Sequence, residues 1–255
     1  EYLPQMHIYG KYATGFTSGG FNADAQTDAE FQQGFDAETL NSYEIGLKNQ
    51  WLDQRLQMNI AFFYNDYQDY QTLDNRSADP LAPLVAPNLG RSVVNAQAAN
   101  TVGTELELMA VLSMDWQMVF SYGYLSSDYT KFDLQGVDVS ESAVFAYTPE
   151  HSAGLSLIYN PNGIAGFRID YQWVDDHYYN SNENSLIEAY GLLGARLDFT
   201  IGKGFSANDE INLAFWGKNL SDEQYKVNGI DVGYAQLATF GEPRSFGIEL
   251  AYHFQ

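Results

Sequence analysis

The chain of 255 residues has no cysteine. Without thiols it can have neither a disulfide framework nor a thiolate metal site. Positive charge is also scarce, with 12 Lys and Arg against 33 Asp and Glu, so the formal net charge is −21. A chain this acidic is not expected to bind nucleic acid, because the phosphate backbone is held chiefly by Lys and Arg.

Long hydrophobic runs are missing as well. The mean hydropathy is −0.31, and no stretch approaches the ~18 consecutive apolar residues of a transmembrane helix. Residues 1–4 show no basic or apolar region of a signal peptide. Aromatic residues, however, make up 15% of the chain, which argues against intrinsic disorder. Two classes remain open: a soluble β protein, and a transmembrane β-barrel, whose hydropathy signal is weak.

Alternation with a period of two is the main pattern in the sequence. In residues 117–125 every second residue is large and apolar. The same alternation recurs in 165–174 and 245–254, where the residues between are small or polar. Strict alternation places one set of side chains on each face of a strand. Runs of roughly ten residues are long for soluble strands but fit tilted membrane strands of about 9–11 residues.

Ten such strands are predicted, joined by connections of alternating length. The strands are expected at residues 6–16, 41–51, 55–67, 102–112, 116–126, 149–160, 164–174, 189–201, 210–219 and 243–254. Short connections at 52–54, 113–115, 161–163 and 202–209 alternate with long ones at 17–40, 68–101, 127–148, 175–188 and 220–242. Up-and-down outer-membrane barrels have short periplasmic turns and long external loops. The predicted fold is therefore all-β: an antiparallel, up-and-down transmembrane β-barrel with about ten strands in this chain.

The two faces of the predicted strands differ in polarity. One face is aliphatic and aromatic, as contact with lipid demands, whereas the other carries charges. Facing a dry core would impose a large desolvation cost on those charges, so they are expected to line a water-filled or plugged lumen. The expected lumen-wall residues are Glu44, Lys48, Glu105, Glu107, Arg168, Arg196 and Lys218, together with Asp170, Asp198 and Glu249. Aromatics near the strand ends resemble interfacial girdles, although aromatics also favour strands in general.

The negative charge is concentrated in the long connections. Residues 17–40, 68–101, 126–150, 174–188 and 221–242 contain 21 Asp and Glu but only 4 Lys and Arg, which leaves 12 and 8 in the rest of the chain. These loops are either a solvated, mutually repelling surface or an electrostatic funnel for cationic or metal-bearing ligands.

Several segments, in order, resemble the TonB-dependent outer-membrane receptors. Similar to that family's motifs are YATGFTSGGFN at 12–22, ETLNSYEIGLK at 38–48, GTELE at 103–107, KNLSDEQY at 218–225 and PRSFGIEL at 243–250. A member of the family has a 22-stranded barrel, an N-terminal plug domain and a TonB-contacting segment (the TonB box). The resemblance therefore implies that residues 1–255 are the C-terminal part of such a barrel, with the plug and TonB box absent.

This resemblance also implies a function, a location and partners. The function would be uptake of a scarce nutrient across the bacterial outer membrane, with a ferric siderophore as the commonest substrate class. The acidic loops weigh against a strongly anionic ferric chelate. Implied partners are outer-membrane lipid and lipopolysaccharide, the remaining plug and barrel strands, the TonB complex, the barrel-assembly machinery and the small-molecule substrate. No cofactor is implied.

The last predicted strand resembles the signal that the barrel-assembly machinery reads. That signal consists of a polar residue, a Gly two positions on, apolar positions and a terminal aromatic. The matching residues are Ser245, Gly247, Leu250, Tyr252 and Phe254, although Gln255 follows the aromatic.

Catalytic and metal motifs are not found in the sequence. The one suggestive cluster is Asp175–Tyr179, at the outer end of a strand, where an Asp–His pair could activate water as in outer-membrane proteases. Neighbouring strand residues point to opposite faces, which argues against such a pair, and no enzyme is predicted. The loop residues proposed to contact ligand are Asp175, Asp176, His177, Tyr178 and Tyr179, with Leu84 and Arg91 from the long loop 68–101. The alternative is an autonomous ten-stranded barrel acting as a protease-like enzyme or an adhesin.

Overall fold

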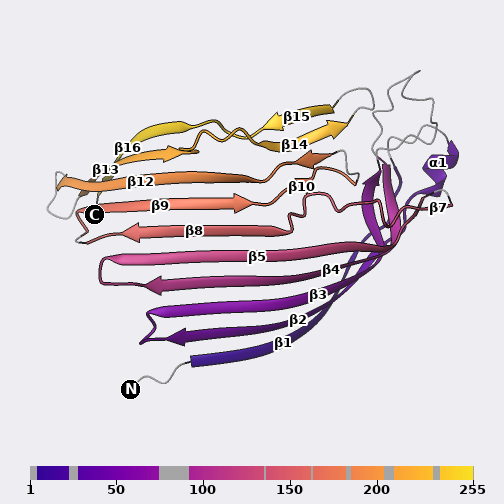
Figure 1. Cartoon of the computed structure of the whole chain (residues 1–255), viewed down its shortest axis with the longest axis horizontal. Helices are drawn as coiled ribbons and strands as arrows, with labels where there is room; N and C mark the ends of the chain where they lie inside the picture. Colours follow the sequence, from indigo (N-terminus) through magenta and orange to yellow (C-terminus); the bar gives the residue numbers. More distant parts are fainter. Residues whose placement is uncertain are drawn as a thin grey trace.

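A computed structural model describes residues 5–22, 28–74, 92–134, 136–161, 163–181, 185–203, 210–231 and 236–254. Ten strands form one antiparallel sheet, in which neighbours in sequence order pair with each other. They are β1 (Gln5–Thr17), β2 (Glu38–Trp51), β3 (Leu56–Asp74), β4 (Ser92–Val111), β5 (Trp116–Lys131), β8 (His151–Tyr159), β9 (Ala165–Val174), β12 (Tyr190–Lys203), β13 (Glu210–Lys218) and β16 (Ser245–His253). This up-and-down order, visible in Figure 1, confirms the predicted all-β fold.

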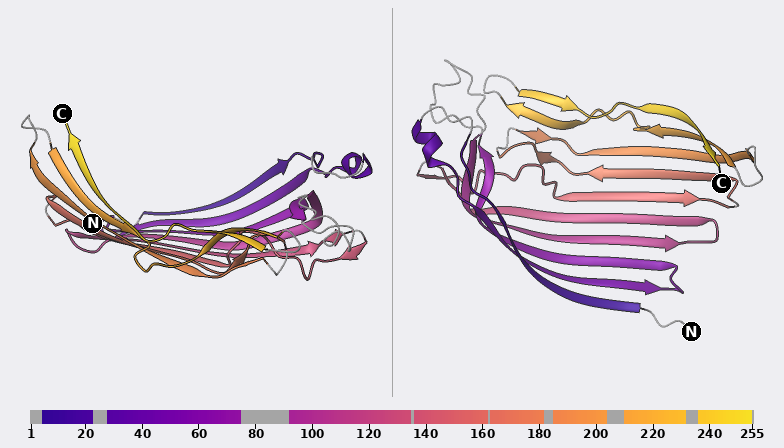
Figure 2. Two further views of the ribbon diagram at one scale, coloured as in Figure 1. Left: turned by 90° about the horizontal axis from the view of Figure 1, so that it is seen from above. Right: turned by 180° about the vertical axis from the view of Figure 1, so that it is seen from behind.

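The ten-stranded sheet is an open arc. Its two edges are β1 and β16, which do not pair with each other in the described part of the chain. Seen from above in Figure 2, the sheet curves upward at both edges and leaves its concave side open. A sheet of this shape is a sector of a larger barrel, and it differs from the closed ten-stranded ring that an autonomous barrel would need.

Short and long connections lie at opposite ends of the strands, as Figure 1 shows. Among the short links, residues 160–164 join β8 to β9, and there the Asn160 side chain accepts a hydrogen bond from the Gly163 amide at 3.0 Å. The long links contain helix α1 (Asp28–Gln33) and three small hairpins. These hairpins are β6–β7 (Asp133–Leu134, Val137–Asp138), β10–β11 (His177–Tyr178, Leu186–Ile187) and β14–β15 (Lys226–Asp231, Gln236–Phe240). Among the described residues, no helix is long and apolar enough to cross a membrane.

The strand registers keep the two faces of the sheet separate from edge to edge. Residues directly opposite each other share a face, so the pairs Tyr12–Tyr43 and Tyr43–Tyr64 define one face across β1, β2 and β3. The same face carries the large apolar residues of every strand to β16, where Ile248 and Leu250 are 70% and 69% exposed. This continuous, solvent-accessible apolar face is the one that contacts lipid.

Aromatic side chains mark both borders of the apolar face. They stand eight residues apart on three strands, as Tyr43 and Trp51 on β2, Trp116 and Tyr124 on β5, and Phe246 and Phe254 at β16. Eight residues span about 27 Å along a strand, which a tilt of about 40° reduces to roughly 20 Å, close to the apolar band of about 25 Å in outer-membrane barrels. The rings also touch along each border: the centroids of Tyr12 and Tyr43 are 5.2 Å apart, and those of Trp116 and Tyr159 are 4.7 Å apart.

Strands β3 and β4 are longer than predicted. The sequence predicts a loop over residues 68–101, but the β3–β4 ladder continues to the pair Asp74–Ser92. Beyond the membrane both faces of the ribbon meet either water or protein, so the lipid-imposed alternation disappears while the backbone pairing continues. The prediction of a loop over 68–74 and 92–101 was therefore wrong.

This extension supports a small buried core outside the membrane. Ala96, Ala99, Tyr129, Phe132 and Phe145 form that outer cluster, and Phe132 and Ala96 are fully buried. The ring centroids of Tyr129 and Phe145 are 4.3 Å apart. The outer cluster thus ties the β3–β4 ribbon to the connection that follows β5.

Two glycines on the polar face allow aromatic rings to lie flat on the sheet. Gly46 is opposite Tyr9 and Gly103 is opposite Phe63. A Cβ atom at Gly46 would lie 2.3 Å from the Tyr9 ring, and one at Gly103 would lie 2.2 Å from the Phe63 ring. Only glycine leaves room for these rings, and the rings in turn cover the exposed glycine backbone.

Candidate functional site

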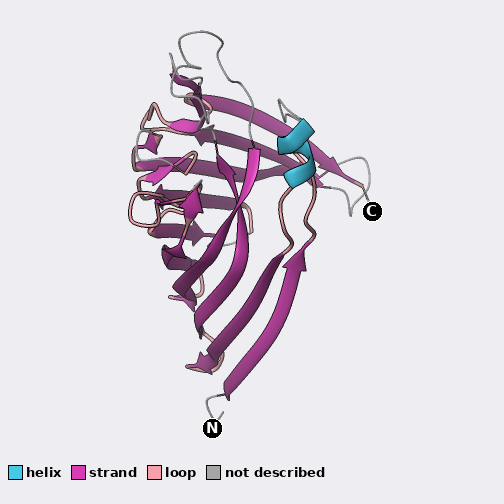
Figure 3. Cartoon of the chain, turned by 90° about the vertical axis from the view of Figure 1, so that its right-hand side faces the viewer, coloured by secondary structure: helices cyan, strands magenta, loops and turns pink. Residues whose placement is uncertain are grey.

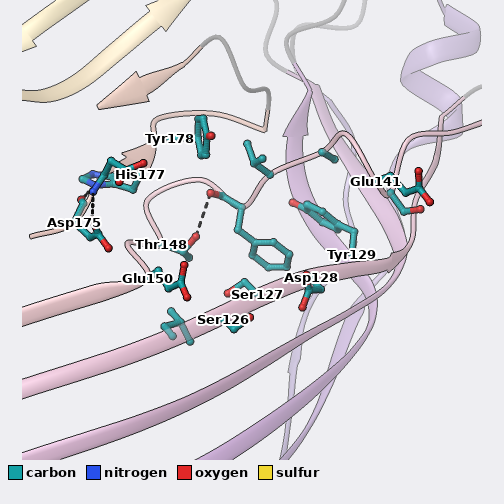
Figure 4. A pocket seen from close by; sticks show the side chains of 16 residues that line it. Ser126, Ser127, Asp128, Tyr129, Glu141, Thr148, Glu150, Asp175, His177 and Tyr178 are labelled. Atoms are coloured by element: carbon teal, nitrogen blue, oxygen red, sulfur yellow. Dashed lines mark hydrogen bonds between the residues drawn. The ribbon is translucent and has the colours of Figure 1, made fainter. Parts of the chain in front are cut away.

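A pocket of about 610 Å³ lies where the outer ends of β5 and β9 meet the connection between β7 and β8. We call it the outer pocket, and Figure 4 shows it from close by. It is lined by Leu125–Tyr129, Ser140, Glu141, Ala143–Phe145, Thr148, Glu150 and Asp175–Tyr178. Three segments that are far apart in the sequence therefore build one hollow at the external end of the sheet.

Backbone hydrogen bonds hold these three segments together. The Leu125 amide donates to the Glu150 carbonyl at 2.9 Å, which joins the end of β5 to the residue before β8. The Tyr147 amide donates to the Tyr178 carbonyl at 2.7 Å, which joins the 143–148 segment to β10. The walls of the pocket are thus connected by main-chain bonds, which do not depend on side-chain identity.

The outer cluster lies directly behind the pocket. Tyr129 and Phe145 belong to the cluster and also line the pocket. Burial raises the pKa of Tyr129, and burial together with the neighbouring Tyr129 raises the pKa of Tyr70, so both phenols are neutral at physiological pH. A packed aromatic floor makes the pocket a preformed feature of the fold.

The lining of the pocket is acidic. Asp128, Glu141, Glu150, Asp175 and Asp176 contribute five carboxylates, and no Lys or Arg is among the described lining residues. Asp175 is half-buried and the other four are exposed. In Figure 4, Glu150 and Asp175 lie on the same side of the pocket, whereas Glu141 lies at the opposite side. Carboxylates on several walls produce a negative potential within the hollow, which attracts cations.

His177 lies beside Asp175 without forming a catalytic pair. Its Nδ1 atom is 3.0 Å from the backbone carbonyl oxygen of Asp175, and the dashed line in Figure 4 marks this contact. The Asp175 carboxylate instead accepts a hydrogen bond from the Asp176 amide at 3.0 Å. A general base oriented by a carboxylate is therefore not formed by these residues in the structure.

The predicted ligand residues fall into three groups. The structure brings Asp175, Asp176, His177 and Tyr178 together in the outer pocket. Tyr179 is 8% exposed and does not line it. Leu84 and Arg91 lie outside the described residues.

Sequence reasoning missed the other two walls of the pocket, which come from 125–129 and 140–150. The available signal was the aromatic triplet Tyr129, Phe132 and Phe145, which is too large for a solvated loop and indicates a local core.

A second cavity, of about 860 Å³, lies on the polar face of the sheet between β5 and β16. Its two arginines are paired with carboxylates: Arg168 contacts Asp170 at 2.7 Å, and Arg196 contacts Asp198 at 2.8 Å and Glu249 at 3.3 Å. We call this hollow the wall cavity.

All ten predicted lumen-wall residues lie on that polar face. Besides the two arginines, Glu44 accepts a hydrogen bond from the Tyr9 hydroxyl at 2.6 Å, and Glu107 accepts one from Asn59 at 3.1 Å. The ammonium groups of Lys48 and Lys218 each lie 5.7 Å from a ring centroid, of Tyr9 and Trp216 respectively. Such contacts are favourable cation–π interactions.

The predicted assembly signal lies on an edge strand. Ser245 begins β16, Gly247 lies beneath the ring of Trp216, and Leu250 and Tyr252 are on the apolar face. Phe254, just beyond the strand, is 81% exposed. Within the described ranges, no group of three or more His, Asp or Glu residues is placed to hold a metal ion.

The comparisons with known proteins all indicate the same family. The profile described as "TonB dependent receptor-like, beta-barrel" matches residues 1–220. The pesticin receptor of Yersinia pestis is 24% identical over 250 residues, which cover 97% of this chain and 34% of that receptor. The probable TonB-dependent siderophore receptor PiuA of Acinetobacter baumannii is 30% identical over 244 residues, which cover 91% of this chain and 30% of PiuA. The chain therefore spans about a third of the length of these relatives.

Solved structures share the fold. The ferric yersiniabactin uptake receptor FyuA from Yersinia pestis superposes with a TM-score of 0.74 at 21% identity, over 98% of this chain and 35% of that one. The copper transporter OprC superposes with a TM-score of 0.71 at 14% identity, over 96% of this chain and 37% of that one. In both comparisons the open ten-stranded arc matches part of a larger structure.

Proposed function

The chain belongs to the TonB-dependent receptor β-barrel family, and from this premise we propose that it is the C-terminal arc of a receptor that imports a ferric siderophore. Its strands lie in the bacterial outer membrane. The missing strands, the plug and the TonB complex would complete the transporter, and the arc would supply part of the wall and the external ligand site. The relatives named above are receptors and transporters, and the barrel strands would do no covalent chemistry.

The observation that carries this proposal is the position of the outer pocket. It lies at the external end of the strands, beyond the aromatic border, and it is held by main-chain bonds and an aromatic floor. A preformed pocket binds with less loss of conformational entropy than a mobile loop does. A ligand arriving from outside would meet this pocket before it reached the paired charges of the wall cavity.

The acidic lining narrows the class of substrate. A polyanionic chelate, such as a tris-catecholate complex, would be repelled by Asp128, Glu150 and Asp175, because like charges at short range raise the free energy of binding. A neutral or cationic chelate would be attracted, and the rings of Tyr129 and Tyr178 offer apolar contact. We infer that the substrate is a ferric siderophore of neutral or positive net charge.

Growth on defined iron sources tests this function. The gene encoding the whole receptor is deleted, and the strain is grown under iron limitation with single ferric siderophores of hydroxamate, catecholate and mixed types. We expect growth to fail on at least one neutral or cationic chelate and to return when the intact gene is restored. Unchanged growth on every chelate would contradict the proposal, and a defect limited to polyanionic catecholates would contradict the assigned charge class.

A further inference from the structure

One buried side chain closes the base of hairpin β14–β15. Asn219 follows β13 and is 6% exposed. Its carboxamide oxygen accepts a hydrogen bond from the Glu223 amide at 2.8 Å, and its nitrogen donates to the carbonyls of Glu223 at 2.9 Å and Glu242 at 3.1 Å. Glu223 lies just before hairpin β14–β15 and Glu242 lies just after it, so these three bonds tie the two ends of the hairpin together. We call them the Asn219 clamp.

Neighbouring contacts reinforce the same closure. The Gly241 amide donates to the Tyr225 carbonyl at 2.9 Å, and Arg244 contacts Asp222 at 3.1 Å. Asn219 itself has a φ of +48°, a left-handed conformation that asparagine tolerates better than most residues. The backbone conformation at this position therefore suits either Asn or Gly, but only Asn has a side chain that can make the three hydrogen bonds of the clamp.

The far part of the hairpin braces the outer pocket. The Tyr147 hydroxyl donates to the Asn228 side chain, and Lys226 Nζ donates to the Leu186 carbonyl at 3.5 Å. The ring of Tyr179 lies against Gly229, where a Cβ atom would be 2.5 Å from it. Tyr147 lies between two pocket-lining residues and Tyr179 directly follows another, so the hairpin contacts the chain neighbours of two walls of the pocket.

We propose that the Asn219 clamp fixes hairpin β14–β15 as a strut against the outer pocket, which makes Asn219 a positioning residue for ligand capture. The capture role rests on the proposed function, whereas the strut rests only on the contacts above. Loop excursions with few buried contacts open at low free-energy cost. A buried carboxamide that makes three hydrogen bonds opposes such opening, and its loss would free both ends of the hairpin at once.

Distance measurements on the receptor test the strut without ligand. The described chain has no native cysteine, and Ser142 and Leu237 are both exposed, beside the pocket and on β15 respectively. Spin labels on Ser142→Cys and Leu237→Cys in the full-length receptor, in its natural membrane, report the separation of pocket and hairpin. The test variant is Asn219→Gly, which keeps the left-handed backbone but removes the clamp.

Asn212→Ala is the matched control. Asn212 lies on β13, near the end of the strand opposite to Asn219, and its side chain accepts a hydrogen bond from the Thr200 hydroxyl at 2.9 Å. We expect Asn219→Gly to raise the population of separated hairpin states by on the order of tenfold and to broaden the distance distribution. Asn212→Ala is expected to leave that distribution unchanged. A narrow distribution in Asn219→Gly, or equal broadening in both variants, would overturn the proposal.

A binding arm separates the strut from the capture role. The same variants are titrated with radioactive-iron complexes of the hydroxamate, catecholate and mixed siderophores. Weaker binding by Asn219→Gly together with a broadened distribution supports both claims. A broadened distribution with unchanged binding would overturn ligand capture at the outer pocket while supporting the strut.

Discussion

The membrane-spanning part of the ten-stranded sheet, which we call the wall, and the region beyond its outer aromatic border arrange the same kinds of residue in opposite ways. In the wall, apolar side chains face outward, and both arginines of the polar face, Arg168 and Arg196, are paired with carboxylates. Among the described residues, the ion pairs of Lys or Arg lie on the polar face or at its rim: Lys11–Glu44, Arg168–Asp170, Arg196–Asp198, Arg196–Glu249 and Arg244–Asp222. Beyond the aromatic border, apolar side chains pack inward into the outer cluster, and the described lining of the outer pocket has five carboxylates but no Lys or Arg. The change of solvent from lipid to water explains the reversal.

Removing the centre of the outer cluster is expected to have the largest effect. Phe132 is fully buried, and its ring centroid is 5.0 Å from that of Tyr129. Phe132→Ala should destabilise the outer region by about 3–5 kcal/mol, because a cavity replaces a packed ring. Hydrogen exchange should rise in residues 92–99 and 129–148 but stay unchanged in the wall.

Phe16→Ala provides the comparison for that change, since Phe16 is 78% exposed. It should leave exchange in both regions unchanged. If Phe132→Ala accelerated exchange equally in the wall, the two regions would be one cooperative unit, and the contrast between them would fail.

A charge on the lipid face should have the next largest effect. Phe62 lies on the apolar face of β3, opposite Ile45 and Thr104. Phe62 lies between the bilayer midplane, where an Arg costs about 2–4 kcal/mol, and the outer interface, where it costs about 0–1 kcal/mol, so Phe62→Arg should reduce the folded fraction in a urea titration in lipid. Asn59→Arg, three residues away on the polar face and beside Glu107, should be nearly neutral. Equal losses in the two variants would refute the assignment of the faces.

A smaller effect is expected where an aromatic ring covers a glycine. Gly103→Ala places a Cβ atom 2.2 Å from the Phe63 ring, so the ring must shift, at a cost of about 1–3 kcal/mol. At Gly10 a Cβ atom would lie 4.0 Å from the backbone carbonyl oxygen of Glu44, so Gly10→Ala should change stability little. Urea unfolding of both variants measures the difference in stability. If Gly103→Ala were as stable as the natural protein, the Phe63 ring would not occupy a fixed position over Gly103.

The smallest effect concerns alkaline pH and is confined to the outer region. Burial raises the pKa of Tyr70 above its ordinary value of 10.0. A group whose pKa is raised by folding contributes stability that is complete below the unfolded pKa and is lost as the pH rises through the folded pKa. Hydrogen exchange in the outer cluster should therefore increase as the pH rises above about 10, the pKa of tyrosine in the unfolded chain.

Tyr70→Phe should reduce that pH response, whereas Tyr12→Phe, on the exposed aromatic border, should not. A response of equal size in the wall strands, or one that survives Tyr70→Phe unchanged, would count against a buried phenol as its source.

The sequence predicted the wall well because lipid imposes a simple rule. One face must be apolar over a fixed length, so residues such as Phe120 and Tyr122 reveal both the strand and its orientation. The pairing of charges could not be predicted, because Arg196 finds Asp198 on its own strand but Glu249 on another, through a register that the pattern alone does not define.

Prediction failed in the region where lipid is absent. Residues 68–74 and 92–101 lack alternation because their ribbon meets water and the outer cluster, yet they remain strands. One wall of the outer pocket was found from Asp175–Tyr178, but the others depend on tertiary packing around Phe145. The role of Asn219 was equally hidden, since its partners Glu223 and Glu242 are distant from each other in sequence.

Uptake kinetics of the restored receptor test the outer pocket most directly. The strain lacking the gene is complemented with the natural receptor, with the double variant Asp175→Asn and Asp176→Asn, or with Glu188→Gln, which changes an exposed acid outside the pocket. With a neutral or cationic ferric siderophore, we expect the double variant to raise the half-saturating concentration by about tenfold, equivalent to about 1.4 kcal/mol, without changing the maximal rate. Glu188→Gln should behave like the natural receptor. An unchanged half-saturating concentration in the double variant would contradict capture at the outer pocket.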